Sequence, residues 1–157
     1  MIKRVLFIFA AIALLSGCGA GGAKFSGLEK PSHDMAQVYI YRPSAFVQSG
    51  NFPDLALDGN PVGQLKNGGF IKFSAPAGDH TLNITGNVLQ WIHRDANMPL
   101  KLEAGKTHFY KLTVSMGGSS TGNSINVGFG QHHSFGFFQI TDEKEALADL
   151  SELNESK

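Results

Sequence analysis

Residues 36–43, with the sequence AQVYIYRP, decide the fold class of this chain of 157 residues. β-Branched and aromatic side chains dominate the stretch, and such residues suit the pleated surface of a sheet. In an extended strand, Val38 and Ile40 point to one face, Tyr39 and Tyr41 point to the other, and the final proline stops the strand. This period of two predicts a β-strand rather than a helix.

The same period of two recurs along the rest of the chain. Residues 55–57 and 62–65 form a predicted hairpin, because Asp58-Gly59-Asn60-Pro61 between them is a strong turn signal. Further predicted strands lie at residues 70–74, 80–85, 88–93, 100–102, 108–116, 125–129 and 135–140. Strands at such short intervals, without helical segments between them, predict a mainly β fold, an antiparallel β-sandwich of about seven to nine strands.

One short α-helix is expected near the C-terminal end, over residues 142–153. Thr141 is a suitable N-cap, and Asp142 and Glu143 favour the positive end of the helix dipole. The apolar stripe that would pack on the sheet consists of Ala146, Leu147, Leu150 and Leu153. The predicted sandwich domain, including this helix, therefore spans residues 36–157.

The first residues are typical of a secretory signal peptide. Lys3 and Arg4 are positively charged, and residues 5–15 carry no polar side chain. At ~1.5 Å of rise per residue, this run is too short to cross a hydrocarbon core of ~30 Å as a helix. A positive start, a short apolar run and small residues after it predict a signal peptide over residues 1–17.

The end of this segment, Leu15-Ser16-Gly17-Cys18, resembles the lipobox of bacterial lipoproteins. The resemblance implies cleavage between Gly17 and Cys18, and attachment of an S-diacylglycerol and an N-acyl chain to Cys18. Several acyl chains would anchor the protein stably in a bilayer, because each buried methylene adds ~0.8 kcal/mol. The next residue is Gly19 and not aspartate, which by analogy with known lipoprotein sorting implies the outer membrane, with the domain facing the periplasm.

Residues 18–35 are rich in glycine, serine and charge, and Phe25 and Leu28 are isolated apolar residues among them. Such a composition predicts a flexible tether that begins at the lipidated cysteine. For a glycine-rich coil, this length gives a typical reach of roughly 20–25 Å. We therefore expect the domain to stand just off the membrane surface.

Several strand-and-turn segments, taken in order, resemble the DUF2846 family of uncharacterised bacterial lipoproteins. The matching segments are residues 38–43 (VYIYRP), 57–59 (LDG), 62–65 (VGQL), 76–80 (PAGDH) and 103–110 (EAGKTHFY). The resemblance implies a β-sandwich related to carboxypeptidase-regulatory or PEGA-like modules, without assigned catalytic residues.

Charge and cysteine content exclude several classes of function. Thirteen basic residues balance thirteen acidic ones, so nothing suggests the basic surface of a nucleic-acid-binding protein. The single cysteine rules out an internal disulfide framework and multi-cysteine metal sites. We expect no catalytic, cofactor-binding or metal-binding residues, and no enzyme activity.

Two functions from different classes stay open. The first is a lipid-anchored, non-enzymatic β-sandwich that binds another envelope protein through an exposed sheet edge or an aromatic patch. The alternative is a metal- or small-molecule-binding periplasmic lipoprotein that uses the loop Gly117–Gly136 and its histidines, His132 and His133, with His108 or His93 completing a site. A hydrolase is a weaker third alternative, which a histidine paired with a serine or carboxylate in a deep pocket would support.

Overall fold

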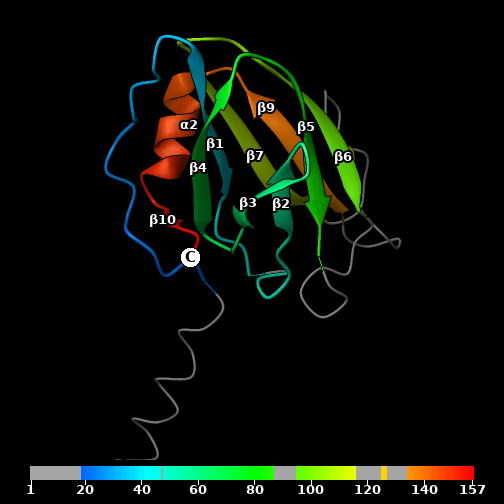
Figure 1. The fold of residues 1–157 in the computed structure, drawn as a ribbon. Coiled ribbons are helices and arrows are strands. Elements are labelled where there is room, and N and C mark those ends of the chain that lie inside the picture. Colours follow the sequence, from blue (N-terminus) through cyan, green and yellow to red (C-terminus); the bar gives the residue numbers. More distant parts are fainter. Residues whose placement is uncertain (1–18, 47, 87–94, 116–124, 127–133) are drawn as a thin grey trace, which may run out of the picture.

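The structure is a computed structural model that describes residues 19–46, 48–86, 95–115, 125–126 and 134–157. Within these residues the fold is mainly β, with two sheets and one short helix near the C-terminal end (Figure 1). The larger sheet has the strand order β10-β4-β1-β7-β9-β8, and the smaller sheet has the order β3-β2-β5-β6. The predicted β-sandwich with a short C-terminal helix is therefore confirmed.

The chain passes from one sheet to the other several times. The larger sheet contains β1 (Met35–Arg42), β4 (Gly69–Pro76), β7 (Thr107–Ser115), β8 (Ile125–Asn126), β9 (Ser134–Ile140) and β10 (Asn154–Glu155). The smaller sheet contains β2 (Asp54–Leu57), β3 (Asn60–Gln64), β5 (Gly78–Thr85) and β6 (Ala96–Leu102). The helix is α2 (Glu143–Leu150). The predicted strand over residues 88–93 lies outside the described residues, and the sequence pattern does not predict the short β10.

Strand β1 lies in the middle of the larger sheet, between β4 and β7, and both of its faces are buried. Val38 and Ile40 join the core between the two sheets. Tyr39 and Tyr41 join a second apolar cluster, on the outer face of the larger sheet, to which α2 contributes Ala146 and Leu150. The alternation predicted for this strand is confirmed, and each set of side chains packs into its own apolar layer.

Two strand pairs of this sandwich are parallel rather than antiparallel. β1 pairs with β7 in parallel, with Ile40 opposite Tyr110, and β10 pairs with β4 in parallel. Between β1 and β7 the chain forms β4 and the whole of the smaller sheet, which provides the long connection that a parallel pair needs. Alternating side chains show which residues face a core but not the direction of the neighbouring strand, so the sequence pattern could not distinguish these arrangements.

Helix α2 is shorter than the helix predicted over residues 142–153. Asp142, rather than Thr141, is the N-cap, and its Oδ1 accepts a hydrogen bond from the backbone N–H of Lys144 at 2.9 Å. Aspartate and threonine both serve well as N-caps, so the sequence could not rank these two neighbours. The helix ends at Leu150, after which the chain turns and β10 pairs with β4.

The flexible tether predicted over residues 18–35 is, from Gly19 onward, a segment that runs along the outside of the domain (Figure 1). We call residues 19–34 the N-terminal strap. The backbone N–H groups of Ala20 and Gly22 donate hydrogen bonds to carbonyl groups in the loop before β4 and in β10, at 3.1 and 2.9 Å. The tether prediction is therefore corrected, because these residues are hydrogen-bonded to the sandwich rather than free of it.

Aromatic contacts hold the middle of the strap. The Phe25 ring packs edge-on against Tyr39 and Phe70, with centroid distances of 6.1 and 5.7 Å. Leu28 packs against the same outer cluster, and the Glu29 N–H donates a hydrogen bond to the Tyr39 hydroxyl at 2.8 Å. The two isolated apolar residues of the segment are thus the ones that fix it, and their partners lie too far along the chain for composition to indicate them.

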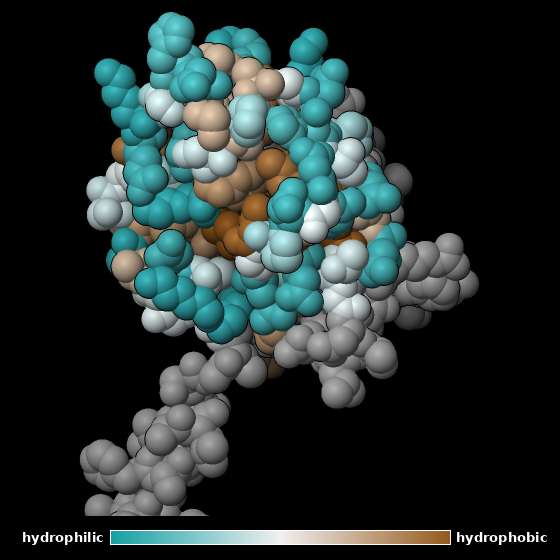
Figure 2. Space-filling model, in the orientation of Figure 1, coloured by the Kyte–Doolittle hydropathy of each residue, from teal (hydrophilic) through white to brown (hydrophobic). Residues whose placement is uncertain are grey.

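Hydrophobic surface lies in the middle of the face that carries β4 and the β2–β3 hairpin (Figure 2). Leu57, Val62 and Phe73, from β2, β3 and β4, are partly buried and pack against the core between the sheets. Within the described residues, the edges of the smaller sheet are β3 and β6, which contain Pro61 and Pro99. Proline has no N–H to donate, so another strand cannot pair along the full length of either edge.

At Gly22 the strap packs too closely against β10 to leave room for a side chain. A Cβ added there would overlap the Glu155 carbonyl oxygen and lie 2.9 Å from the Glu155 Cβ, whereas a Cβ at Gly21 would meet nothing within 4 Å. We expect Gly22→Ala to lower the free energy of unfolding by about 1–3 kcal/mol through overpacking. Gly21→Ala, the matched control, should leave it unchanged or raise it by up to about 1 kcal/mol. Urea unfolding followed by circular dichroism measures both, and equal effects would contradict the packed strap.

Candidate functional site

The predicted lipidation site, Cys18, and the adjacent cleavage position, Gly17, lie outside the described residues. The next residue, Gly19, is already paired with Asn67 in an isolated β-bridge. A bond of this bridge runs from the Ala20 N–H to the backbone oxygen of Asn67, at 3.1 Å. Adjacent Cα atoms are ~3.8 Å apart, so any group attached to Cys18 would be one short step from a residue fixed on the domain.

Arg42, the last residue of β1, holds the loop over residues 43–53 that follows it. The buried guanidinium donates hydrogen bonds from Nη1 to the Asn51 carbonyl at 2.5 Å and from Nη2 to the Gln48 carbonyl at 2.7 Å. Burial lowers the pKa of Arg42 to about 10, which leaves the group charged at neutral pH. Arg42 therefore braces this loop from the side of the core.

Asn67 holds the same loop from its other end. The Asn67 Oδ1 accepts a hydrogen bond from the Ala45 N–H at 2.9 Å. Gln48 has a φ of +62°, in the left-handed region that residues other than glycine seldom adopt. Among the described residues, Phe46 is the large hydrophobic side chain left exposed, with 98% of its surface open to solvent. The fold thus exposes the Phe46 ring on a loop that hydrogen bonds hold in place, next to Asn67, which also binds the start of the strap.

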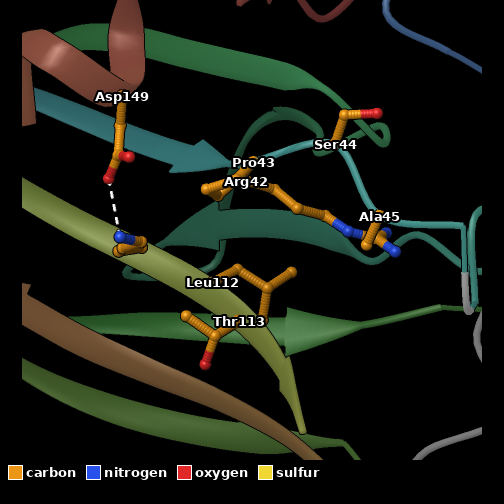
Figure 3. Close-up of a pocket in the computed structure, with 8 residues that line it drawn as sticks. Arg42, Pro43, Ser44, Ala45, Leu112, Thr113 and Asp149 are labelled. Carbon is orange, nitrogen blue, oxygen red and sulfur yellow. Dashed lines mark ion pairs between the residues drawn. The ribbon is translucent and has the colours of Figure 1, made fainter.

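A hollow of about 270 Å³ lies beside this loop, between β1, β7 and α2 (Figure 3). The Lys111 Nζ in its wall forms ion pairs with Asp149 at 2.7 Å and Glu145 at 3.5 Å, both on α2. Burial lowers the pKa of Lys111, but the hydrogen bond and charge of Asp149 outweigh it, so the pKa is raised overall. Lys111 and Arg42 both have acceptors within the protein, and these charges fasten α2 and the loop to the sheet.

Asp58, in the turn between β2 and β3, forms an aspartate–histidine pair with a residue of β5. Asp58 and Gly59 have φ values of +50° and +80°, which are typical of a two-residue hairpin turn. The Asp58 Oδ2 lies 2.6 Å from Nδ1 of His80 on β5, and its Oδ1 accepts a hydrogen bond from the Thr81 N–H at 2.7 Å. The His80 Nε2 lies 2.9 Å from the Pro76 carbonyl oxygen. Because both ring nitrogens face oxygen acceptors, a protonated imidazolium satisfies this arrangement best.

This pair lacks the setting of a hydrolase site. The Asp58 side chain is 45% exposed, and the ring nitrogen that would act as a base faces the Pro76 carbonyl instead. Residues 118–122, GSSTG, have the Gly-x-Ser-x-Gly spacing of a nucleophile elbow, but they lie outside the described residues. The described residues therefore give no support to the hydrolase alternative.

The histidines considered for a metal site are not brought together in the described part of the chain. Three of them lie outside it: His93, His132 and His133. His108 is buried, its Nε2 accepts a hydrogen bond from the Glu103 N–H at 3.0 Å, and burial lowers its pKa. His108 therefore fixes the turn before β7. Among the described residues, no group of three or more histidine, cysteine, aspartate or glutamate side chains is arranged to hold a metal ion.

Neither Asn67 nor Phe46 is among the candidate site residues that the sequence indicates. Asn67 precedes Gly68-Gly69 and reads as an ordinary turn residue, with nothing to indicate what its side chain binds. Phe46 and Phe52 are the two aromatic residues between Pro43 and Pro53, and aromatic residues in such a short loop are a signal that could have been noted.

The Asp58–His80 pair predicts a pH dependence of stability. The hydrogen bond to Asp58 raises the pKa of His80 above its ordinary value of 6.5, and the same bond lowers the pKa of Asp58 below 3.8. A raised histidine pKa adds stability that is present below the unfolded pKa and is lost as pH rises through the folded pKa. A lowered aspartate pKa adds stability that is lost as pH falls through it. The pair therefore stabilises the hairpin most between about pH 4 and pH 6.5.

We expect the wild-type protein to lose stability relative to His80→Gln when the pH is raised from about 6 to about 8. Urea unfolding of both proteins at both pH values measures the difference, which removes the contributions of the other histidines. His33→Gln, which changes an exposed histidine before β1, is the matched control and should keep the wild-type behaviour. An identical pH dependence in the wild type and His80→Gln would contradict the assigned role of the pair.

Comparison with known proteins identifies the family of the chain. No helix in the described part of the chain is long and apolar enough to cross a membrane. A search of curated proteins finds no match. The family described as "Protein of unknown function (DUF2846)" matches residues 32–125, which contain β1 to β7 in order. Because this match covers more than half of the chain, the protein belongs to the DUF2846 family.

Proposed function

We propose that this protein is a bacterial envelope lipoprotein, anchored in the outer membrane by acyl chains on Cys18, with its domain in the periplasm. The observation that carries the proposal is the stretch Leu15-Ser16-Gly17-Cys18 at the end of a short apolar run. Cleavage between Gly17 and Cys18 would make the cysteine the first residue of the mature protein. The strap supports the proposal, because Gly19 is bound to the sandwich and would couple the anchor directly to the domain.

The sandwich in this proposal is a non-enzymatic binding module. The assignment is supported by polar groups that already bind other parts of the protein. Arg42 binds carbonyl groups of a loop, Lys111 pairs with α2, and His80 faces two acceptors. Groups engaged in this way stabilise the fold rather than activate a substrate. A relation to carboxypeptidase-regulatory or PEGA-like modules is part of the same proposal, and it is compatible with the two-sheet architecture.

We expect Cys18→Ser to abolish acylation and to release the protein from the membrane fraction, because only a thiol at this position can accept the diacylglycerol. Mass spectrometry of protein purified from its native host measures the added acyl chains, and fractionation measures the release. The matched control, Cys18→Ser combined with Ser26→Cys, keeps one thiol at an exposed strap position and should also lack acyl chains. A wild-type protein with a free thiol and an intact leader would contradict the proposal.

The partner that we propose for the module is another envelope protein. The hydrophobic surface in the middle of the face that carries β4 and the β2–β3 hairpin supports a contact there (Figure 2), whereas the prolines in β3 and β6 disfavour strand addition along those edges. Crosslinking of the full-length protein in native membranes, followed by mass spectrometry, should recover the same partner in independent preparations. Because Phe73 also packs against the core, Phe73→Asp should reduce this crosslink in protein whose circular dichroism spectrum matches that of the wild type, and Lys101→Asp, an exposed change on β6, is the control. Recovery of the uncrosslinked protein alone in every preparation would count against a protein partner.

A further inference from the structure

We infer that the end of the sandwich around Asn67 rests on the bilayer and that Phe46 inserts into the lipid interface beside the acyl anchor. The occupant of this surface is thus a lipid membrane. The inference rests on the proposed lipidation of Cys18. It adds a second membrane contact and a fixed orientation, neither of which follows from an acylated cysteine alone.

The first step is the short distance between the anchor and the domain. Gly19 forms a bridge with Asn67, and the Ala20 N–H donates a hydrogen bond to the same residue. Only the backbone of Cys18 therefore separates the acyl chains from a fixed point, ~3.8 Å between Cα atoms. A glycine-rich tether over residues 18–35 would instead have given a reach of roughly 20–25 Å. With the strap docked, the Asn67 end of the sandwich has no room to stand away from the lipid headgroups.

The second step is the location of Phe46. The Asn67 side chain accepts a hydrogen bond from the Ala45 N–H at 2.9 Å, and the Asn67 backbone carbonyl binds the strap. One residue therefore holds both the start of the strap and the residue before Phe46. The start of the strap and the loop after β1 lie at one end of the sandwich (Figure 1). An acyl anchor at Cys18 therefore brings Phe46 to the membrane surface as well.

The third step is that the loop is built to keep Phe46 exposed. A single exposed hydrophobic residue is common on protein surfaces and by itself indicates nothing. Here the loop is fastened by Asn67 on one side of Phe46 and by Arg42 on the other, and Gln48 adopts a left-handed backbone conformation. These supports hold a ring that is 98% exposed instead of letting it fold back onto the core. Phenylalanine is one of the residues that protein surfaces bury in the membrane interface.

The structure also supplies a control position at the opposite end. The Gly105 N–H donates a hydrogen bond to the carbonyl of Met35, the first residue of β1, whereas the Phe46 loop follows its last residue. At about 3.3 Å per residue, the eight residues of β1 separate the two ends by about 23 Å. Ala104 is exposed in the turn beside Gly105 and should point into the aqueous phase.

The experiment compares Phe46→Trp with Ala104→Trp in the full, acylated protein. Each variant is reconstituted into vesicles of phosphatidylethanolamine and phosphatidylglycerol whose acyl chains carry bromine, which quenches tryptophan on contact. The wild-type protein contains a single tryptophan, Trp91, and supplies the background to be subtracted. We expect the added fluorescence of the Phe46→Trp variant to shift to shorter wavelength and to lose most of its intensity. The added fluorescence of the Ala104→Trp variant should keep nearly all of its intensity.

The outcomes separate this inference from the proposed function. Equal quenching of the Phe46→Trp and Ala104→Trp variants, in protein whose mass confirms acylation, would overturn the inference and leave the lipid anchor intact. An unmodified Cys18 in the same preparation would overturn both. Lack of quenching in these protein-free vesicles, combined with a crosslink from position 46 to a protein in native envelopes, would assign the surface to a protein partner and also overturn the inference.

Discussion

Both faces of strand β1 are buried, so the rest of the fold must cover each face with an apolar layer. From Ala36 to Tyr41, no residue exposes more than 2% of its surface. Burying a large apolar side chain contributes about 1.5–3 kcal/mol, so a strand with such side chains on both faces needs two apolar layers to be stable. The smaller sheet provides one layer, and α2 with the N-terminal strap provides the other. The sheet, the helix and the strap are therefore parts of one domain.

The outer layer explains why both ends of the described chain meet on the same side of the larger sheet. Helix α2 has only eight residues, and it contributes Ala146 and Leu150 to the aromatic cluster on β1 and β4. Phe25 and Leu28 from the strap cover more of this cluster. Strand β10 then pairs with β4, and the Glu155 carbonyl accepts a hydrogen bond from the strap. The contacts that complete the core thus also hold the strap from Gly22 to Leu28 against the sandwich.

Local patterns in the sequence predicted the elements, whereas contacts between distant segments could not be predicted. The period of two located β1, and Asp58-Gly59 located the hairpin turn, because a few neighbouring residues contain these signals. Composition assigned residues 18–35 to a tether because it cannot show that Phe25 has an aromatic partner elsewhere. The direction of β7 relative to β1 was missed for the same reason. At the candidate site, Asn67 is important only through its position beside the strap, which no local pattern encodes.

A docked strap and a flexible tether give a lipoprotein different properties. A glycine-rich tether lets a domain sample many orientations and a range of heights above the membrane, so each face meets partners for only part of the time. With the proposed acyl anchor, a domain fixed at Asn67 would keep one end at the bilayer and the other about 23 Å away, along the direction of β1. The entropy of orientation is then lost when the strap folds, so it is not lost again each time the domain binds a partner. In the proposed non-enzymatic module, such preorganisation is the physical means by which a β-sandwich would bind selectively to another component at the same membrane.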